Sequence, residues 1–317
     1  PRSGTKLLRD LLNNHSRVAI PENESLFLPK AVRRFGPGPA FNQSDLISFW
    51  TYFTSTKFFG NQVERGLEMS RSTIYKEEPS DWEALIGRLF LYCSPKPITA
   101  DIIWGDKTPG YVLHIDLLLK AFPNARFVHI VRDPRDYVCS VRNAWGRSIY
   151  RAAERWQITM QSVRQCKAIT ESNYLEVKYE ELIQSPEVVL ERICKFLEIG
   201  YESGMDNLKR QTENLGDAKG ETRILAGNTG KFISKLSKAE LYKVESIVLT
   251  EMINYGYQPV SDSVVQTTLS SSQHKYYRVV DAFASFRFHV GQRGLLAGTS
   301  YFYKLYKDHS WRNTEAD

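Results

Sequence analysis

The chain has 317 residues, of which 42% are hydrophobic and 25% charged, and it contains four cysteines. These are ordinary proportions for a globular protein, and the length is enough to bury a large core. The net charge of +6 suits an anionic ligand, but the basic residues are too scattered to predict nucleic-acid binding.

The chain opens on the turn PRSGTK (1–6), and leucines recur at helical spacing from Leu7 to Leu12. Gly4 lets the backbone approach an anion closely, and the N–H groups that follow it can point at a phosphate at the positive end of the helix. Side-chain donors surround the glycine (Arg2, Ser3 and Thr5). The turn lacks the Walker A pattern, which argues against a magnesium-dependent NTPase, and an ordinary loop before a helix is the alternative.

A short strand is predicted at 17–20, and Glu22 and Glu24 follow it. A carboxylate here lies near the first loop if this strand neighbours the one that leads into the loop. The alternative is that both acidic residues favour the start of the next helix.

Residues 45–59 predict an aromatic-rich helix, and Ser80 with Glu83 predicts a capping box that opens a helix through Tyr92. We expect these helices to cover the sheet and shape an acceptor pocket. Their aromatic side chains fit a core better than a ligand platform.

A second apolar strand is predicted at 98–104, followed by the polar turn 105–109 and a helix from Pro109 to Phe122. This turn also follows a strand, so it should lie in the crevice at the carboxyl ends of the strands, beside the first loop. Lys107 would face this crevice or, alternatively, solvent. We expect His114, which lies among leucines, to be packed.

The segment RFVHIVRDPRDYVCSVRNAW (126–145) predicts a buried strand, a sharp turn and a helix. Arg132 stands at the carboxyl end of the strand, where open α/β sheets bind ligands. Ser140 lies about two helical turns further on, so an arginine fork and a hydroxyl could close on one anion. The alternative is that Arg132 pairs with Asp133 or Asp136 to cap the helix.

After a long helix from Ile149 to about Thr170, YLEVKYEEL predicts a strand that turns into a helix at Tyr179. Ser237 and Glu240 predict the capped start of another helix, which closes at Gly256. Residues 260–274 are rich in Ser and Thr and predict a linker, and residues 275–317 predict a basic, aromatic helical tail. The tail could dock on the domain, pair with another subunit or lie on a membrane surface, but it has no apolar run long enough to span a bilayer.

PRSGT before a helix and RDPRDxxxS after a later strand resemble the motifs of sulfotransferases that use 3′-phosphoadenosine 5′-phosphosulfate (PAPS), especially bacterial-type and protein-tyrosine-type members. The resemblance extends from Pro1 to about Tyr257. It implies an α/β fold with a P-loop-type parallel sheet flanked by helices, forming one sulfotransferase domain over 1–259 with a helical C-terminal extension. That fold needs a strand before the loop, so we expect a chain trimmed at its N-terminus.

The resemblance also implies roles for particular residues. The first loop holds the 5′-phosphosulfate, through Arg2, Ser3, Gly4, Thr5 and Lys6, where Lys6 replaces a second threonine usual in the family. Arg132 and Ser140 hold the 3′-phosphate, Tyr179 contacts the adenine, and Lys231 or Arg223 lies near the phosphates. Lys107 and Arg2 stabilise charge on the transferring and leaving groups, and Glu24 is the base, with Glu22 as the alternative.

The predicted activity is sulfuryl transfer from PAPS to a hydroxyl by in-line displacement without a metal. The acceptor could be a sugar, a tyrosine, a lipid or a small alcohol. A P-loop kinase or nucleotide hydrolase, or a nucleotide-binding scaffold without catalysis, are the alternatives. The cysteines lack metal spacing and predict buried free thiols, which favours a reducing compartment and a cytoplasmic location.

Overall fold

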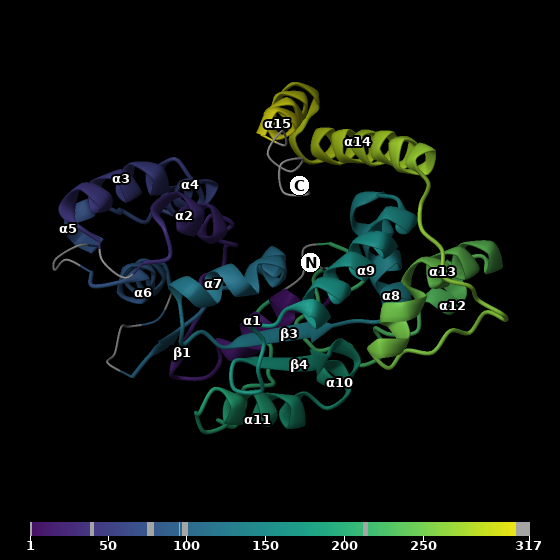
Figure 1. Ribbon diagram of the computed structural model, residues 1–317, viewed down its shortest axis with the longest axis horizontal. Coiled ribbons are helices and arrows are strands. Elements are labelled where there is room, and N and C mark those ends of the chain that lie inside the picture. The colour runs from purple at the N-terminus through teal and green to yellow at the C-terminus, as the bar shows by residue number, and fades with distance from the viewer. Residues whose placement is uncertain are drawn as a thin grey trace.

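The computed structural model describes residues 2–38, 41–74, 79–94, 96, 101–211 and 215–308 (Figure 1). Pro1, 98–100 of the predicted second strand and 309–317 of the tail lie outside these ranges. Within them the strands form two parallel pairs: β1 (Val18–Ala19) with β2 (Ile103–Trp104), and β3 (Phe127–Val131) with β4 (Tyr174–Lys178). Parallel pairing was predicted and is confirmed, although β1 and β2 are shorter than expected.

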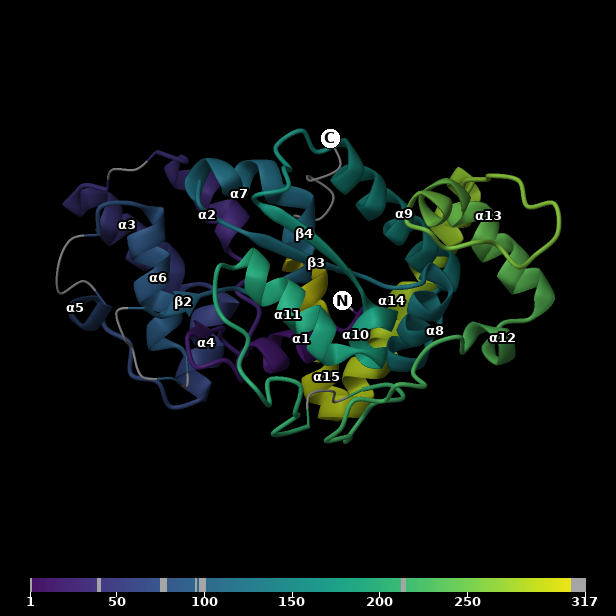
Figure 2. The same ribbon diagram turned by 90° about the horizontal axis from the view of Figure 1, so that it is seen from below.

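Helices cover one side of β3 and β4. These are α1 (Thr5–Leu12), α10 (Tyr179–Gln184) and α11 (Pro186–Phe196). Figures 1 and 2 place α10 and α11 beneath the two strands. Leu11, Val177, Leu182 and Leu190 are fully or almost fully buried in this core. It joins the first loop's helix to the strand that precedes Tyr179.

A second core lies on the other side, between the helices α8 (Pro134–Trp145), α9 (Ile149–Gln165), α12 (Phe232–Lys235) and α13 (Lys238–Asn254). Val138, Ala153, Val244 and Val248 are completely buried there. The capping box of Ser237 and Glu240 at the start of α13 is present as predicted. This core fixes the helix that carries Ser140.

A layer of helices stands to one side of the strands in Figure 1. It comprises α2 (Leu28–Phe35), α3 (Gln43–Thr54), α4 (Lys57–Glu64), α5 (Arg71–Ile74), α6 (Trp82–Tyr92), η1 (Pro109–His114) and α7 (Ile115–Ala121). Its core is aromatic, as expected, with Phe49, Phe53 and Trp82 fully buried.

Two details of this layer correct the sequence prediction. Residues 45–59 do not form one helix, because the side chain of Thr56 accepts from Phe59 N and starts α4. The cap of α6 is Asp81, whose carboxylate accepts from Ala84 N at 2.8 Å, and Ser80 instead donates to Asp81. In both cases a side-chain oxygen accepts from the backbone N–H three residues later and thereby fixes the start of a helix.

The C-terminal helices α14 (Ser271–Arg293) and α15 (Leu295–Asp308) form a hairpin, which Figure 1 shows on the opposite side of the molecule from α11. The first helix begins at Ser271 rather than at residue 275, and the stretch before it lies on α13, with Thr267 N donating to Ser246 O at 2.8 Å. Asp281 accepts from Arg151 at 2.6 Å, which holds the hairpin on α9. In the part of the chain described, no helix is both long and apolar enough to cross a membrane.

All four cysteines are free thiols, and all but Cys166 are buried. Burial raises the pKa of the Cys93 thiol to about 12 and those of Cys139 and Cys194 to about 11. These thiols are therefore unreactive core residues.

Candidate active site

The first loop folds tightly against the end of β4. Arg2 and Gly4 have φ angles of 69° and 85°, a region that costs free energy for any residue except glycine. A Cβ on Gly4 would lie 2.5 Å from Cδ2 of Tyr179. Only glycine therefore fits where the loop turns into α1.

Arg132 follows β3 directly and is 5% exposed. Its Nη1 donates to Arg2 O at 3.1 Å and its Nη2 to Asn228 O at 3.0 Å, while its guanidinium lies 4.4 Å from the centre of the Tyr179 ring. Nε is buried and has no hydrogen-bond partner among the described residues. A buried arginine that lines a pocket and has one N–H group without a partner is suited to an anion.

The carboxylates that could have paired with Arg132 face other partners. Asp133 accepts from Arg135 at 2.7 Å, and Asp136 accepts from the backbone N–H groups of Gly230 and Phe232. The alternative in which Arg132 caps its own helix is therefore not what the structure shows.

The side chain of Arg2 points toward α8. Its Nε donates to Ser140 Oγ at 3.1 Å and its Nη2 to Leu215 O at 3.0 Å. The first loop and the arginine–serine motif thus meet, as the sequence predicted from two distant segments. The Arg2 side chain therefore extends from the loop toward Ser140 on α8.

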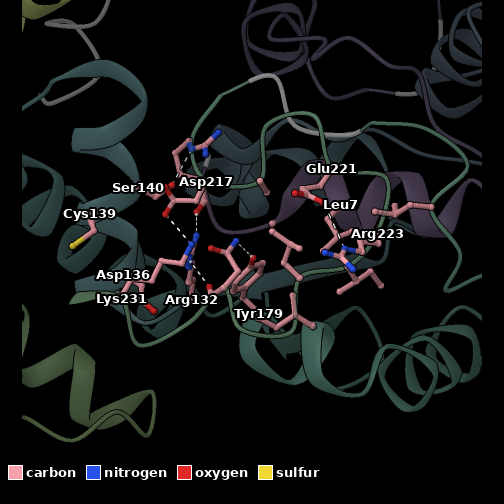
Figure 3. A pocket seen from close by; sticks show the side chains of 18 of the residues that line it. Leu7, Arg132, Asp136, Cys139, Ser140, Tyr179, Asp217, Glu221, Arg223 and Lys231 are labelled. Carbon is pink, nitrogen blue, oxygen red and sulfur yellow. Dashed lines mark hydrogen bonds and ion pairs between the residues drawn. The ribbon is translucent and has the colours of Figure 1, made fainter. Parts of the chain in front are cut away.

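Several predicted residues line one pocket, part of which is open to solvent (Figure 3). They are Arg2, Gly4, Arg132, Ser140, Tyr179 and Lys231. The Tyr179 hydroxyl accepts from Asn228 Nδ2 at 2.6 Å, and Lys231 donates to Asp217 at 2.8 Å. Arg223 lines the far end of the same pocket, whereas Ser3, Thr5 and Lys6 stand half-buried at the start of α1.

A second cluster forms where the segment after β1 meets the turn after β2. Lys107 Nζ donates to Glu24 Oε1 at 2.5 Å, and the two side chains are 9% and 36% exposed. Desolvation lowers the pKa of Lys107, the Glu24 carboxylate opposes this, and the charges of Arg9 and Lys6 add to the lowering. Arg9 Nη1 on α1 donates to Glu22 O at 2.6 Å, which holds the segment that carries Glu24 beside α1.

Glu22 faces other cations. It forms ion pairs with Arg210 and, at 3.3 Å, with Arg65. Partial burial acts to raise its pKa, but the hydrogen bond from Arg210 and the surrounding arginines outweigh this and lower it. Of the two acidic residues, Glu24 is thus the one that meets Lys107.

A buried polar network supports this cluster. Asp106 accepts from Ser25 Oγ and, at 2.9 Å, from Thr108 Oγ1, while Ser25 Oγ also lies 2.5 Å from the Tyr111 hydroxyl. Desolvation raises the pKa of Asp106 to about 6 in spite of these hydrogen bonds. The network ties the segment that carries Glu24 to the turn that carries Lys107.

Two further features of the cluster lack a sequence signal. Leu26 has a φ of 61° and is 52% exposed, so an apolar side chain in a strained conformation stands next to Glu24 and Ser25. His114, expected to be packed, is half-buried and within 3.4 Å of Arg33.

Sequence reasoning also missed pocket residues that belong to no motif. Asn228 holds Arg132 and Tyr179, Lys235 lines the pocket, and Asp217 pairs with Lys231 and Lys235. Only the mixture of Lys, Asp and Asn between residues 217 and 235 hinted at a polar site. Across the described ranges no group of three or more His, Cys, Asp or Glu side chains is placed to hold a metal ion.

The arrangement brings an anion pocket and a carboxylate–lysine pair to one loop and its helix. A family model described as the sulfotransferase family matches residues 1–203 of the chain. The chain belongs to the sulfotransferase family. The family expected from the two motifs is thereby confirmed.

Curated relatives include protein-tyrosine sulfotransferase A of Caenorhabditis elegans, which is 27% identical over 64% of this chain and 49% of its own length. The omega-hydroxy-beta-dihydromenaquinone-9 sulfotransferase Stf3 of Mycobacterium bovis is 27% identical over 36% of this chain and 33% of its own length. The chain spans about half or less of the length of these relatives.

Among solved structures, the sulfotransferase domain of the Synechococcus PCC 7002 olefin synthase matches with a TM-score of 0.52 and 20% identity. The match covers 81% of this chain and 92% of that domain, and a sulfotransferase domain from the curacin biosynthetic pathway matches with a TM-score of 0.51. The α/β sulfotransferase fold predicted from the sequence is confirmed.

Proposed function

We propose that this sulfotransferase takes the sulfuryl group from PAPS and transfers it to an acceptor hydroxyl by in-line displacement. The observation that carries the proposal is Arg132, a buried arginine whose Nε lacks a partner among the described residues and whose guanidinium opens into a pocket shared with Ser140 and Tyr179. The pocket residues fit a nucleotide that carries a second phosphate, because a charge-assisted donor and a hydroxyl converge from β3 and α8.

In this proposal Arg132 and Ser140 bind the 3′-phosphate. The adenine lies beside Tyr179, whose ring is 4% exposed and packs against the guanidinium of Arg132. The loop from Arg2 to Lys6 binds the 5′-phosphosulfate with its backbone N–H groups at the start of α1. Lys231 supplies further positive charge, and Arg223 stands at the other end of the pocket.

The chemistry would take place at the Glu24–Lys107 pair. Glu24 accepts the proton of the acceptor hydroxyl as its oxygen bonds to sulfur, and the bond between sulfur and the 5′-phosphate oxygen breaks, releasing adenosine 3′,5′-bisphosphate. Lys107 stabilises charge on the sulfuryl oxygens, and Arg2, which reaches Ser140, stabilises the leaving bisphosphate. Such positioned charges usually supply most of the rate enhancement in group transfer of this kind.

The acceptor is a hydroxyl compound. One relative is named for tyrosine in proteins and another for an omega-hydroxy menaquinone, so a tyrosine or a lipid alcohol are the acceptors to test first, before sugars and small alcohols. The exposed Leu26 next to Glu24 favours an acceptor with an apolar part.

Binding of adenosine 3′,5′-bisphosphate by the Arg132→Ala variant, measured by calorimetry, tests the donor. We expect binding to weaken by about 2 kcal/mol, because a charge-assisted contact to the 3′-phosphate is lost, and binding of AMP to change little. Arg142→Ala is the matched control, since Arg142 lies on α8 but pairs with Glu240. Equal losses for both nucleotides would make Arg132 a structural residue only.

Two further measurements separate the alternatives. Tighter binding of ATP with magnesium than of the bisphosphate would favour a kinase or nucleotide hydrolase. Nucleotide binding without transfer of labelled sulfate to any acceptor would favour a scaffold that has lost catalysis.

A further inference from the structure

Asp217 brings a negative charge into the pocket that is otherwise suited to anions. Its carboxylate accepts from Lys231 Nζ at 2.8 Å, from Lys235 Nζ at 2.6 Å and from Asn143 Nδ2 at 2.7 Å. Asp217 and both lysines line the pocket together with Arg132 and Ser140. Two of the pocket's cations therefore already share one negative charge that the chain itself supplies.

The carboxylate lies where α8 presents its polar face to the pocket. Asn143 and Ser140 are three residues apart on this helix, so their side chains lie on the same face. Figure 3 shows Ser140, Asp217, Lys231 and Arg132 at one end of the pocket, whereas Glu221 and Arg223 stand at the other end. Asp217 is thus at the end to which the 3′-phosphate is assigned.

The segment that carries Asp217 is held over the pocket by the first loop. Arg2 Nη2 donates to Leu215 O at 3.0 Å, and a Cβ on Gly216 would lie 2.5 Å from the same nitrogen. Partial burial acts to raise the pKa of Asp217, but the hydrogen bonds from Lys231 and Lys235 outweigh it and lower the pKa to about 2. The side chain is therefore a carboxylate at neutral pH.

We propose that Asp217 competes with the 3′-phosphate for Lys231 and Lys235 and that a nucleotide with this phosphate displaces it; this inference rests on the proposed function. A carboxylate and a phosphate take the same lysine and amide donors, and two anions at one end of a pocket repel each other. Binding of the 3′-phosphorylated nucleotide then includes the free-energy cost of breaking the contacts of Asp217. The same contacts re-form when adenosine 3′,5′-bisphosphate leaves, which assists product release.

The test compares wild type with Asp217→Asn, which keeps the size of the side chain and removes its charge. We expect Asp217→Asn to bind adenosine 3′,5′-bisphosphate on the order of 10-fold more tightly, with a slower dissociation rate, and to bind AMP with nearly unchanged affinity. Asp217→Ala should likewise bind adenosine 3′,5′-bisphosphate more tightly than wild type does and bind AMP with nearly unchanged affinity. Glu221→Gln is the matched control, because it removes one negative charge from the same segment at the other end of the pocket.

Each other outcome overturns a definite statement. A wild type that prefers the bisphosphate to AMP, with no gain in Asp217→Asn, overturns the role of Asp217 and leaves the proposed function intact. If Asp217→Asn binds AMP more tightly by the same factor, or if Glu221→Gln gains the same affinity for the bisphosphate, the effect comes from net charge alone. Either result also overturns the role of Asp217. A wild type without any preference for the bisphosphate contradicts the proposed function and this inference with it.

Discussion

At the scale of single residues, the two acidic side chains after β1 differ in the cations that surround them, and these cations influence how readily each carboxylate accepts a proton. Glu22 pairs with Arg65, which directly follows α4, and with Arg210, whereas Glu24 meets the lysine of the neighbouring turn. An acid enclosed by arginines is a poor proton acceptor because the surrounding cations stabilise its ionised form. The structure thus favours the acidic residue that the sequence pattern also favours.

For Glu24→Gln we expect turnover to fall by about 100-fold or more while affinity for PAPS stays near that of wild type, because glutamine keeps the shape but cannot accept a proton. Initial rates with labelled PAPS and a responsive acceptor measure this. Glu22→Gln is the control, since it changes the same charge in the same segment. A loss confined to Glu22→Gln would show that the base is Glu22, and near-normal rates in both would direct the search to Asp106 and His114.

Asp106 predicts a dependence of stability on pH. Its pKa is raised from 3.8 to about 6 in the folded protein, so the folded state holds the proton more strongly than the unfolded state. The stability contributed by the protonated acid is present below pH 4 and is lost as the pH rises through 6. The free energy of unfolding of wild type should therefore fall by on the order of 3 kcal/mol relative to that of Asp106→Asn between pH 4 and pH 7. Urea unfolding at a series of pH values tests this, and parallel curves for the two proteins would contradict it.

At the scale of elements, a buried ion cluster fixes the start of α8 to α13. Arg135 donates to Asp133 at 2.7 Å and to Glu245 at 2.8 Å, and Glu245 also accepts from Val260 N and Ser261 N. Each member is less than one tenth exposed. The helix that carries Ser140 is thereby held by charges that are largely shielded from water.

Glu245→Ala should lower the free energy of unfolding by about 3–5 kcal/mol, because it leaves Arg135 buried with one partner fewer and removes the acceptor of two backbone N–H groups. Denaturant unfolding measures the change. Arg192→Ala breaks the exposed pair with Glu181 and should cost less than about 1 kcal/mol. Similar losses in the two variants would mean that the buried cluster contributes little.

At the scale of the whole molecule, the net charge of +6 and the cations of the pocket would act together on the anionic nucleotide of the proposed function. Salt screens this attraction, so the Kd of adenosine 3′,5′-bisphosphate should rise with ionic strength, on the order of 10-fold between 50 and 500 mM sodium chloride. AMP carries less negative charge and should show a weaker dependence. Calorimetry over a salt series measures both, and equal dependence for the two nucleotides would contradict a charge-selective pocket.

Local signals in the sequence determined the elements that carry the motifs. The apolar run of Phe127–Val131 forms β3, Pro134 opens α8, and Ser237 with Glu240 caps α13, because each depends on residues a few positions apart. The two motifs were also sufficient to predict the family. Local reasoning failed at Ser80, where the adjacent Asp81 caps α6 instead, and within 45–59, where Thr56 starts a second helix.

Tertiary structure alone decided which side chains meet across the chain. The direction of Arg2 toward Ser140, the pairing of Glu24 rather than Glu22 with Lys107, and the position of Asp217 between two lysines join residues that lie far apart in the sequence. Such contacts depend on the relative placement of β1, β2, β3 and α8, which is set by the buried cores. The sequence pattern around each residue therefore does not predict them. For this reason the motifs predict which groups serve an anion, while only the fold shows that the chain supplies an anion of its own.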